Sequence, residues 1–153
     1  MELYNQTIKD YLVKLSSKTP APGGGSATAV LLSLGIALFI MCLRYSKVNI
    51  EDTEFNKKRE KELTDYLQKA MKLIQEDKEA YLRLSNLLKE KDKVGIKNAY
   101  LECTLIPLKM LDICQKVLEI IEPLSPKIKK SLISDFIVSL NFLETALLSA
   151  NIF

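Results

Sequence analysis

A loop of six residues near the start of the chain, residues 20–25, is the first place where the sequence suggests chemistry. It reads PAPGGG and holds five of the chain's ten glycine and proline residues. Ser26 and a charge-free run at 27–43 follow it directly. One glycine is enough for a tight turn, so three in succession predict that something packs against bare backbone there. The free N–H groups and dipole of a helix that begins here would favour an anionic group, although a plain turn between helices is the alternative.

An acidic residue, Asp77, interrupts an otherwise apolar helix seam. The seam has alternating spacings of four and three residues and consists of Leu63, Leu67, Ala70, Ile74, Tyr81, Leu84 and Leu88. Its one gap falls at position 77. A carboxylate on a packed stripe is costly unless it is paired, protonated or facing a wet pocket. Asp77 is therefore a candidate functional residue, unless the helix bends there and the side chain reaches solvent.

The chain contains no histidine, which excludes Ser–His and Cys–His catalysis and histidine metal ligation. Acid–base chemistry would fall to Asp, Glu, Lys, Tyr or water. Three cysteines, Cys42, Cys103 and Cys114, lie in apolar runs without the spacing of metal ligands. They are typical of reduced core residues in a cytoplasmic protein, and we expect no metal site.

Helical periodicity dominates the chain and no strand-like alternation stands out, so we expect an all-α fold. Residues 1–153 are most simply a single domain, a multihelical bundle of about five helices. The expected helices cover residues 7–17, 26–46, 53–91, 94–122 and 126–153. Prolines mark two of the boundaries, since Pro20 and Pro22 end the first helix and EPLSP at 122–126 separates the last two.

Charge and hydropathy limit the expected partners. The net charge is only +3 and acidic and basic residues alternate, which does not indicate a nucleic-acid binder. The run at 27–43 is short for a membrane span, so a buried bundle helix is expected and no membrane partner. Beyond Lys130 only Asp135 and Glu144 are charged. A helix this apolar needs cover on every side, which predicts a homodimer contact.

Several segments resemble the cyclodeaminase/cyclohydrolase family. TPAPGGGSATAVLLSLGIALFIMCL, at 19–43, resembles the family's glycine motif and the small-residue helix after it. Three later segments are similar to family segments in the same order: EDKEAYLRL at 76–84, TLIPLKML at 104–111 and SDFIVSLNFLETALLSANI at 134–152. The resemblance implies an all-helical, dimeric protein with a folate pocket near the glycine loop. The chain departs from it by being shorter and by keeping little of the basic stretch after the second helix.

The resemblance implies a cytoplasmic enzyme of one-carbon metabolism that needs no metal and no cofactor other than its tetrahydrofolate substrate. A methenyltetrahydrofolate cyclohydrolase hydrolyses 5,10-methenyltetrahydrofolate to 10-formyltetrahydrofolate. A formiminotetrahydrofolate cyclodeaminase forms the methenyl bridge and releases ammonia. We expect the cyclohydrolase, because the cyclodeaminase is often fused to its transferase. The alternatives are the cyclodeaminase and a non-catalytic folate-binding or oligomeric helical paralogue.

Two carboxylates, Asp135 first and Asp77 second, are the candidate catalytic residues, with the base not assigned between them. The methenyl bridge is a delocalised cation that water attacks, so a nearby carboxylate would stabilise it and accept the proton. A solvent-facing acid near a helix N-terminus is the alternative for Asp135. The expected substrate-binding residues are Pro22, Gly23, Gly24, Gly25, Ser26 and Asn151, together with Arg44 and Lys47 for the glutamate tail. Both cations have a plain alternative as helix-end charges that complement the dipole.

Overall fold

The computed structural model describes residues 2–46, 53–91 and 93–153, and all its regular structure in these ranges is helical. The five long helices are α1 (Ile8–Leu15), α2 (Gly24–Ser46), α3 (Thr53–Glu90), α4 (Lys93–Ile121) and α5 (Ile133–Ala150). Short 3-10 helices are η1 (Leu3–Asn5), η3 (Glu122–Lys127) and η4 (Lys130–Leu132). The all-α prediction is confirmed. The last long helix begins at Ile133 rather than near 126, because the proline-containing segment forms 3-10 turns.

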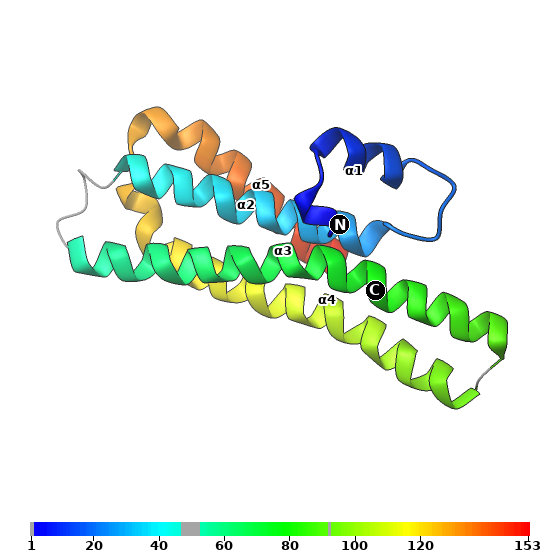
Figure 1. Cartoon of the computed structure of the whole chain (residues 1–153). Helices are drawn as coiled ribbons and strands as arrows, with labels where there is room; N and C mark the ends of the chain where they lie inside the picture. Colours follow the sequence, from blue (N-terminus) through cyan, green and yellow to red (C-terminus); the bar gives the residue numbers. More distant parts are fainter. Residues whose placement is uncertain (1, 47–52, 92) are drawn as a thin grey trace.

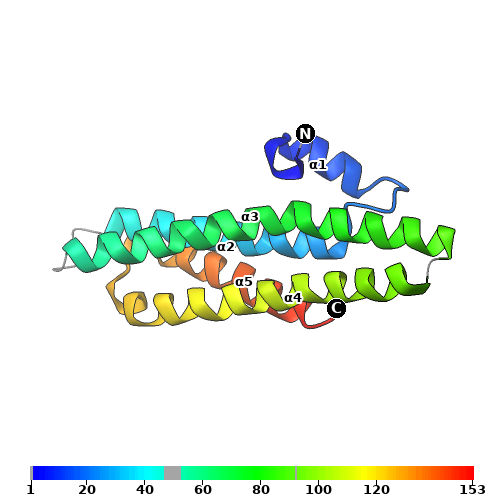
Figure 2. The ribbon, with the colours of Figure 1, turned by 60° about the horizontal axis from the view of Figure 1, so that its bottom comes forward.

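The longest helices, α3 and α4, form an antiparallel hairpin, and α2 and α5 lie along one part of it (Figures 1 and 2). The closed end of the hairpin projects beyond the start of α2 (Figure 1). The short α1 lies on the outside of the bundle, near the start of α2. The start of α2 therefore lies where four packed helices give way to two.

Helix α2 is the central element of the core. Its side chains Leu32, Ile36, Phe39 and Leu43 are fully buried, as expected for a bundle helix with no charge over most of its length. The prediction of a buried helix at 27–43 is therefore confirmed. Helix α2 begins at Gly24, two residues before the expected start at Ser26.

Helix α5 crosses α2 in the opposite direction and at close range. Phe136 packs against Phe39 with ring centroids 5.8 Å apart. Nearer the start of α2, the Ser139 hydroxyl donates a hydrogen bond of 2.9 Å to the Gly35 carbonyl. A Cβ atom on Gly35 would lie 2.8 Å from Cγ of Leu143, so the close crossing requires glycine at that position.

Two helical segments, Gly24–Ser46 and Lys130–Ala150, are long and apolar enough by composition to cross a membrane. The apolar window of the first is 61% buried within the protein, whereas that of the second is only 17% buried. Burial in the core of the bundle explains the apolar composition of the first segment. The second leaves an apolar face of α5 uncovered, formed by Ile133, Ile137, Val138 and Leu148.

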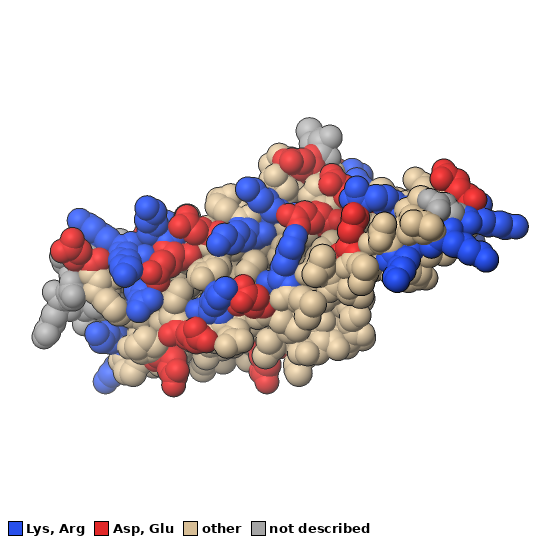
Figure 3. All heavy atoms as spheres, turned by 90° about the horizontal axis from the view of Figure 1, so that it is seen from below, with Lys and Arg blue, Asp and Glu red and all other residues tan. Residues whose placement is uncertain are grey.

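Acidic and basic side chains are interspersed over the face viewed in Figure 3. Basic side chains gather over the projecting end of the α3–α4 hairpin (Figure 3). Elsewhere on this face most basic groups have acidic neighbours, as the alternating sequence predicts.

Candidate active site

A cleft of about 440 Å³ opens beside the first turn of α2. The glycine loop forms one wall, and the facing wall comes from the parts of α3 and α4 next to the projecting end of the hairpin. The loop contributes Pro20, Ala21, Gly23, Gly24 and Gly25, α3 contributes Asp77, Ala80, Tyr81 and Leu84, and α4 contributes Tyr100, Cys103, Thr104, Ile106 and Pro107. Phe153 completes the lining. The glycine loop and Asp77, which the sequence singles out separately, therefore belong to one site.

Asp77 packs directly against the backbone of the glycine loop. A Cβ atom on Gly25 would lie 2.7 Å from Cγ of Asp77, so a side chain at position 25 and this position of the carboxylate exclude each other. The backbone N–H of Ser26, in the same turn, faces the carboxylate and lowers its pKa. The interpretation of three glycines as a close backbone approach is correct, and here the approaching group is the protein's own carboxylate.

Burial raises the pKa of Asp77 above its ordinary value, and the backbone N–H of Ser26 offsets part of this shift. The described residues that line the cleft include no lysine or arginine. A positive helix N-terminus favours the carboxylate, whereas the apolar walls disfavour it. Asp77 is thus a half-buried carboxylate with raised proton affinity, the property expected of a general base. The alternative, in which Asp77 turns to solvent at a bend in its helix, is wrong.

Aromatic rings give the cleft a second property. Tyr81, one turn after Asp77 on α3, and Tyr100 on α4 both line it, as does Phe153. The Phe153 ring lies 3.0 Å from where a Cβ atom on Gly24 would stand. Aromatic faces around one polar group suit a planar heteroaromatic ligand. Sequence periodicity places Tyr81 in the packed seam and does not identify Tyr100 or Phe153. The spacing of four from Asp77 to Tyr81 is the available signal.

The other loop residues take supporting positions. Pro22 is buried behind the loop, follows a cis peptide bond and is not among the lining residues. Ser26 is also buried, and its hydroxyl lies 3.1 Å from that of Tyr11. Asn151 caps α5, where its side chain donates to the Leu147 carbonyl at 2.9 Å. Pro22, Ser26 and Asn151 therefore lie at the edge of the cleft region, while the three glycines form its wall.

Asp135 lies at the other end of the bundle. It is in the first turn of α5, next to Phe136, which packs on Phe39. The pKa of the Cys42 thiol is raised first by burial and then by the charge of Asp135, so the carboxylate is close to Cys42. At 1.5 Å per residue, the helix from Gly25 to Cys42 spans about 25 Å. The structure does not bring Asp135 to the cleft that holds Asp77 in the same chain.

Arg44, one of the two cations expected to hold the glutamate tail, is not at this cleft either. Arg44 is in the last turn of α2 and forms a 2.8 Å ion pair with Glu60. Lys47 lies outside the described residues. Because Arg44 is near the end of α2 opposite the glycine loop, the structure separates it from Asp77 as it does Asp135.

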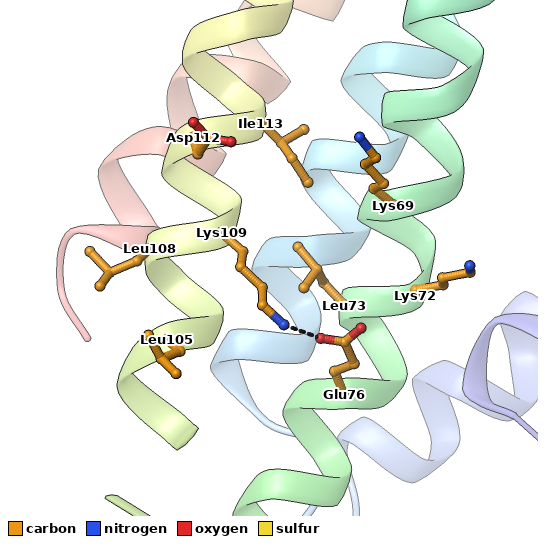
Figure 4. Close-up of a pocket in the computed structure, with 9 residues that line it drawn as sticks. All are labelled: Lys69, Lys72, Leu73, Glu76, Leu105, Leu108, Lys109, Asp112 and Ile113. Carbon is orange, nitrogen blue, oxygen red and sulfur yellow. Dashed lines mark hydrogen bonds and ion pairs between the residues drawn. The ribbon is translucent and has the colours of Figure 1, made fainter. Parts of the chain in front are cut away.

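A second groove, of about 500 Å³, lies between α3 and α4, and none of the candidate site residues predicted from the sequence lines it. Figure 4 shows Lys109 reaching from α4 to Glu76 on α3, a contact of 2.8 Å, while Lys72 points away. Asp112 is also paired, at 2.7 Å, with Lys116. Both carboxylates are partly or fully exposed and neutralised, so this groove lacks the isolated carboxylate found beside Gly25. Within the described ranges, no three Cys, Asp or Glu side chains gather as a metal-ligand group.

Comparison with known proteins finds a matching family and similar individual proteins. The family model described as formiminotransferase-cyclodeaminase matches residues 7–153. The chain is 29% identical over 143 residues to a methenyltetrahydrofolate cyclohydrolase from Methylorubrum extorquens, covering 86% of this chain and 69% of the relative. Its fold is similar to the crystal structure of formiminotetrahydrofolate cyclodeaminase from Thermotoga maritima, with a TM-score of 0.88 at 17% identity. That match covers 99% of this chain and 77% of the solved one.

Proposed function

Because this chain belongs to the formiminotransferase-cyclodeaminase family, we propose that it is an enzyme that hydrolyses 5,10-methenyltetrahydrofolate to 10-formyltetrahydrofolate. The curated relative is named as a methenyltetrahydrofolate cyclohydrolase. One structural observation carries the proposal: the half-buried Asp77 carboxylate is held at the first turn of α2, inside a cleft whose lining includes aromatic rings and no described cation.

The charge of the cleft suits this substrate. The methenyl bridge of the folate is a delocalised cation, and a carboxylate in surroundings of low dielectric attracts it more strongly than it would in water. Tyr81, Tyr100 and Phe153 supply aromatic faces for the planar ring system next to the bridge. Asp77 thus both selects the charged form of the ligand and lies where the reactive carbon would be held.

The hydrolysis needs only one proton acceptor, Asp77, and one water molecule as the nucleophile. Water adds to the bridge carbon while Asp77 takes one of its protons, giving a neutral hydroxyl adduct. The protonated Asp77 then delivers a proton to the pterin nitrogen as its bond to the bridge carbon breaks. The adduct's hydroxyl proton leaves to solvent as the formyl carbonyl forms. We assign the base to Asp77 rather than Asp135, because only Asp77 lies in the cleft of this chain.

The cyclodeaminase reaction is the second candidate, and the fold match to formiminotetrahydrofolate cyclodeaminase favours it. Its product is the same methenyl cation, so Asp77 could stabilise that product equally well. A non-catalytic folate-binding paralogue is the third candidate. All three candidate functions would use the same cleft. They differ in which folate, if any, the protein converts.

Near-ultraviolet absorbance of 5,10-methenyltetrahydrofolate separates these candidates. Purified protein is expected to accelerate loss of the absorbance above the spontaneous rate. A rise of the same absorbance from 5-formiminotetrahydrofolate, with release of ammonia, would identify the cyclodeaminase instead. If neither rate changes while the protein binds the folate, the chain is a binding protein and the proposed enzyme function is wrong.

We further propose a cytoplasmic homodimer whose contact includes the exposed apolar face of α5. Ile137 and Leu148 on this face are 51% and 62% exposed, which is costly for helix positions without a covering partner. The three free cysteines, Cys42, Cys103 and Cys114, suit a reducing compartment. The proposal includes no metal, no cofactor apart from the folate substrate, and no nucleic-acid or membrane partner.

A further inference from the structure

Helix α1 has one buried side chain in its contact with the bundle. Tyr11 is the only residue of α1 that is buried. The apolar side chains Ile8, Leu12 and Val13 are instead more than half exposed. The Tyr11 hydroxyl lies 3.1 Å from the Ser26 hydroxyl, and both side chains are buried. Leu15 packs partly against the core, so Tyr11 and Leu15 are the side chains by which α1 contacts the bundle.

The Tyr11 contact ends in the helical turn against which Asp77 packs. The Ser26 hydroxyl lies 3.1 Å from that of Tyr11, the neighbouring Gly25 is in close contact with the Asp77 carboxylate, and the Ser26 backbone N–H lowers the Asp77 pKa. Three elements therefore meet through one residue: α1 through Tyr11, the first turn of α2 through Ser26, and α3 through Asp77.

A fixed Ser26 matters because the three residues before it are glycines, which have the greatest backbone freedom of any residue. The close approach of Asp77 leaves no room for a side chain at Gly25 that could stiffen the turn. Within the turn, the Ala27 N–H donates to the Gly23 carbonyl at 3.0 Å and the Thr28 hydroxyl donates to the Gly24 carbonyl at 2.9 Å. From outside the turn, the Tyr11 hydroxyl is a buried group placed to hold Ser26.

We propose that Tyr11 is a positioning residue, which holds Ser26 so that its backbone N–H points at the Asp77 carboxylate. The inference rests on the proposed function only for its effect on turnover. The geometric part concerns Ser26 and Asp77 and is testable without folate.

The charged and titratable groups around Asp77 are few. Tyr11 from α1, Tyr81 from α3, and Tyr100 and Cys103 from α4 lie at or beside the cleft. The pKa values of Tyr11 and Cys103 are raised, first by burial and also by the charge of Asp77. Both groups are neutral near pH 7. The proton affinity of Asp77 therefore depends mainly on its burial and on the Ser26 N–H, so a disturbance of Ser26 is readable as a change in the Asp77 pKa.

The test is a carbon-13 NMR titration of the Asp77 carboxyl group in the protein without folate, with the signal assigned by its absence in Asp77→Asn. Tyr11→Phe keeps the buried ring and removes the hydroxyl alone. A weaker hydrogen bond destabilises the charged form, so we expect the Asp77 pKa to rise by roughly half a unit. Ser26→Ala should give a rise of similar size, because it removes the other half of the same contact.

The double variant and a matched control make the outcome decisive. Tyr11→Phe combined with Ser26→Ala should shift the pKa no further than either change alone, because both remove one interaction. Tyr45→Phe, at a residue 66% exposed near the far end of α2, should leave the pKa unchanged. An Asp77 pKa that Tyr11→Phe does not move, or additive shifts in the double variant, would overturn the proposal.

The kinetic readout separates this inference from the proposed enzyme function. If the protein turns over methenyltetrahydrofolate, Tyr11→Phe should lower kcat roughly fivefold with little change in KM, and move the acid limb of the pH profile to higher pH. If no variant turns over a folate, the proposed function fails and the NMR titration still decides the role of Tyr11. Thermal unfolding of each variant shows that any change occurs in folded protein.

Discussion

Gly25 and Asp77 share one space: a Cβ atom on Gly25 would lie 2.7 Å from Cγ of the Asp77 side chain. The structure can therefore accommodate either a side chain at position 25 or the carboxylate in its present place. This exclusion gives the glycine motif a direct link to the proposed chemistry, and it leads to the first prediction.

Gly25→Ala is expected to displace the Asp77 carboxylate from the first turn of α2. Overpacking at this contact should cost about 1–3 kcal/mol of stability. Because the proposed base moves, kcat should fall roughly a hundredfold. Thermal unfolding and the methenyltetrahydrofolate assay measure the two effects. Gly23→Ala is the stability control, since a Cβ atom there meets nothing within 4 Å. Equal losses of stability in the two variants would contradict the proposed exclusion.

The two candidate carboxylates should differ sharply in their effect on turnover. Asp77→Asn keeps the shape of the side chain and removes the proton acceptor, so kcat should fall by about a hundredfold or more. Asp135→Asn should have a smaller effect, because Asp135 lies beside Cys42 at the other end of α2. Initial rates under saturating folate provide the comparison. A larger loss in Asp135→Asn would show that the base has been assigned to the wrong helix.

Asp77 should reduce the stability of the folded protein at neutral pH. Its pKa is raised by burial above the ordinary value of 3.8, so the folded chain binds this proton more tightly than the unfolded chain does. Stability linked to this group is complete below pH 3.8 and is lost as the pH rises through the folded pKa. Asp77→Asn should therefore unfold at a higher temperature than wild type at pH 7, with the difference disappearing towards pH 3.5.

The same titration predicts the activity profile. Turnover needs the carboxylate form, so kcat should fall as the pH drops through the raised pKa of Asp77. The matched control for the stability experiment is Asp112→Asn, which alters an exposed, paired carboxylate in the groove of Figure 4. A gain in stability at pH 7 in this control as large as that in Asp77→Asn would contradict the explanation by burial.

The exposed face of α5 should mediate the homodimer. Ile137→Lys places a charge on that face and is expected to convert the protein to monomers at micromolar concentration, because an unpaired charge is costly in an apolar contact. Light scattering coupled to size exclusion measures the mass. Ile8→Lys, at a residue 79% exposed on α1, is the control and should leave the dimer intact. A wild-type protein that is already monomeric would refute this contact.

Sequence periodicity predicted the long helices, because the spacing of apolar residues within one helix reflects which of its faces is buried. The charge-free run at 27–43 predicted the central helix, and the gap in the apolar seam singled out Asp77 as a candidate functional residue. Neither the charge-free run nor the apolar seam indicates how two helices are oriented relative to each other. Asp135 therefore could not be placed, since only the antiparallel crossing of α2 and α5 puts it beside Cys42. The role of Tyr11 was missed for a related reason, because its hydroxyl contact joins residues from separate helices.

The glycine wall of the cleft is made of main chain, and this has a consequence for how the protein can diversify. Main-chain atoms are the same in every variant that keeps the shape of the loop, so mutation cannot change the chemistry of that wall gradually. The facing wall carries Tyr81, Leu84, Tyr100 and Thr104 on the two helices that run into the projecting hairpin. Changes in substrate preference among descendants of this chain should accumulate on that side, while the loop keeps the same backbone surface.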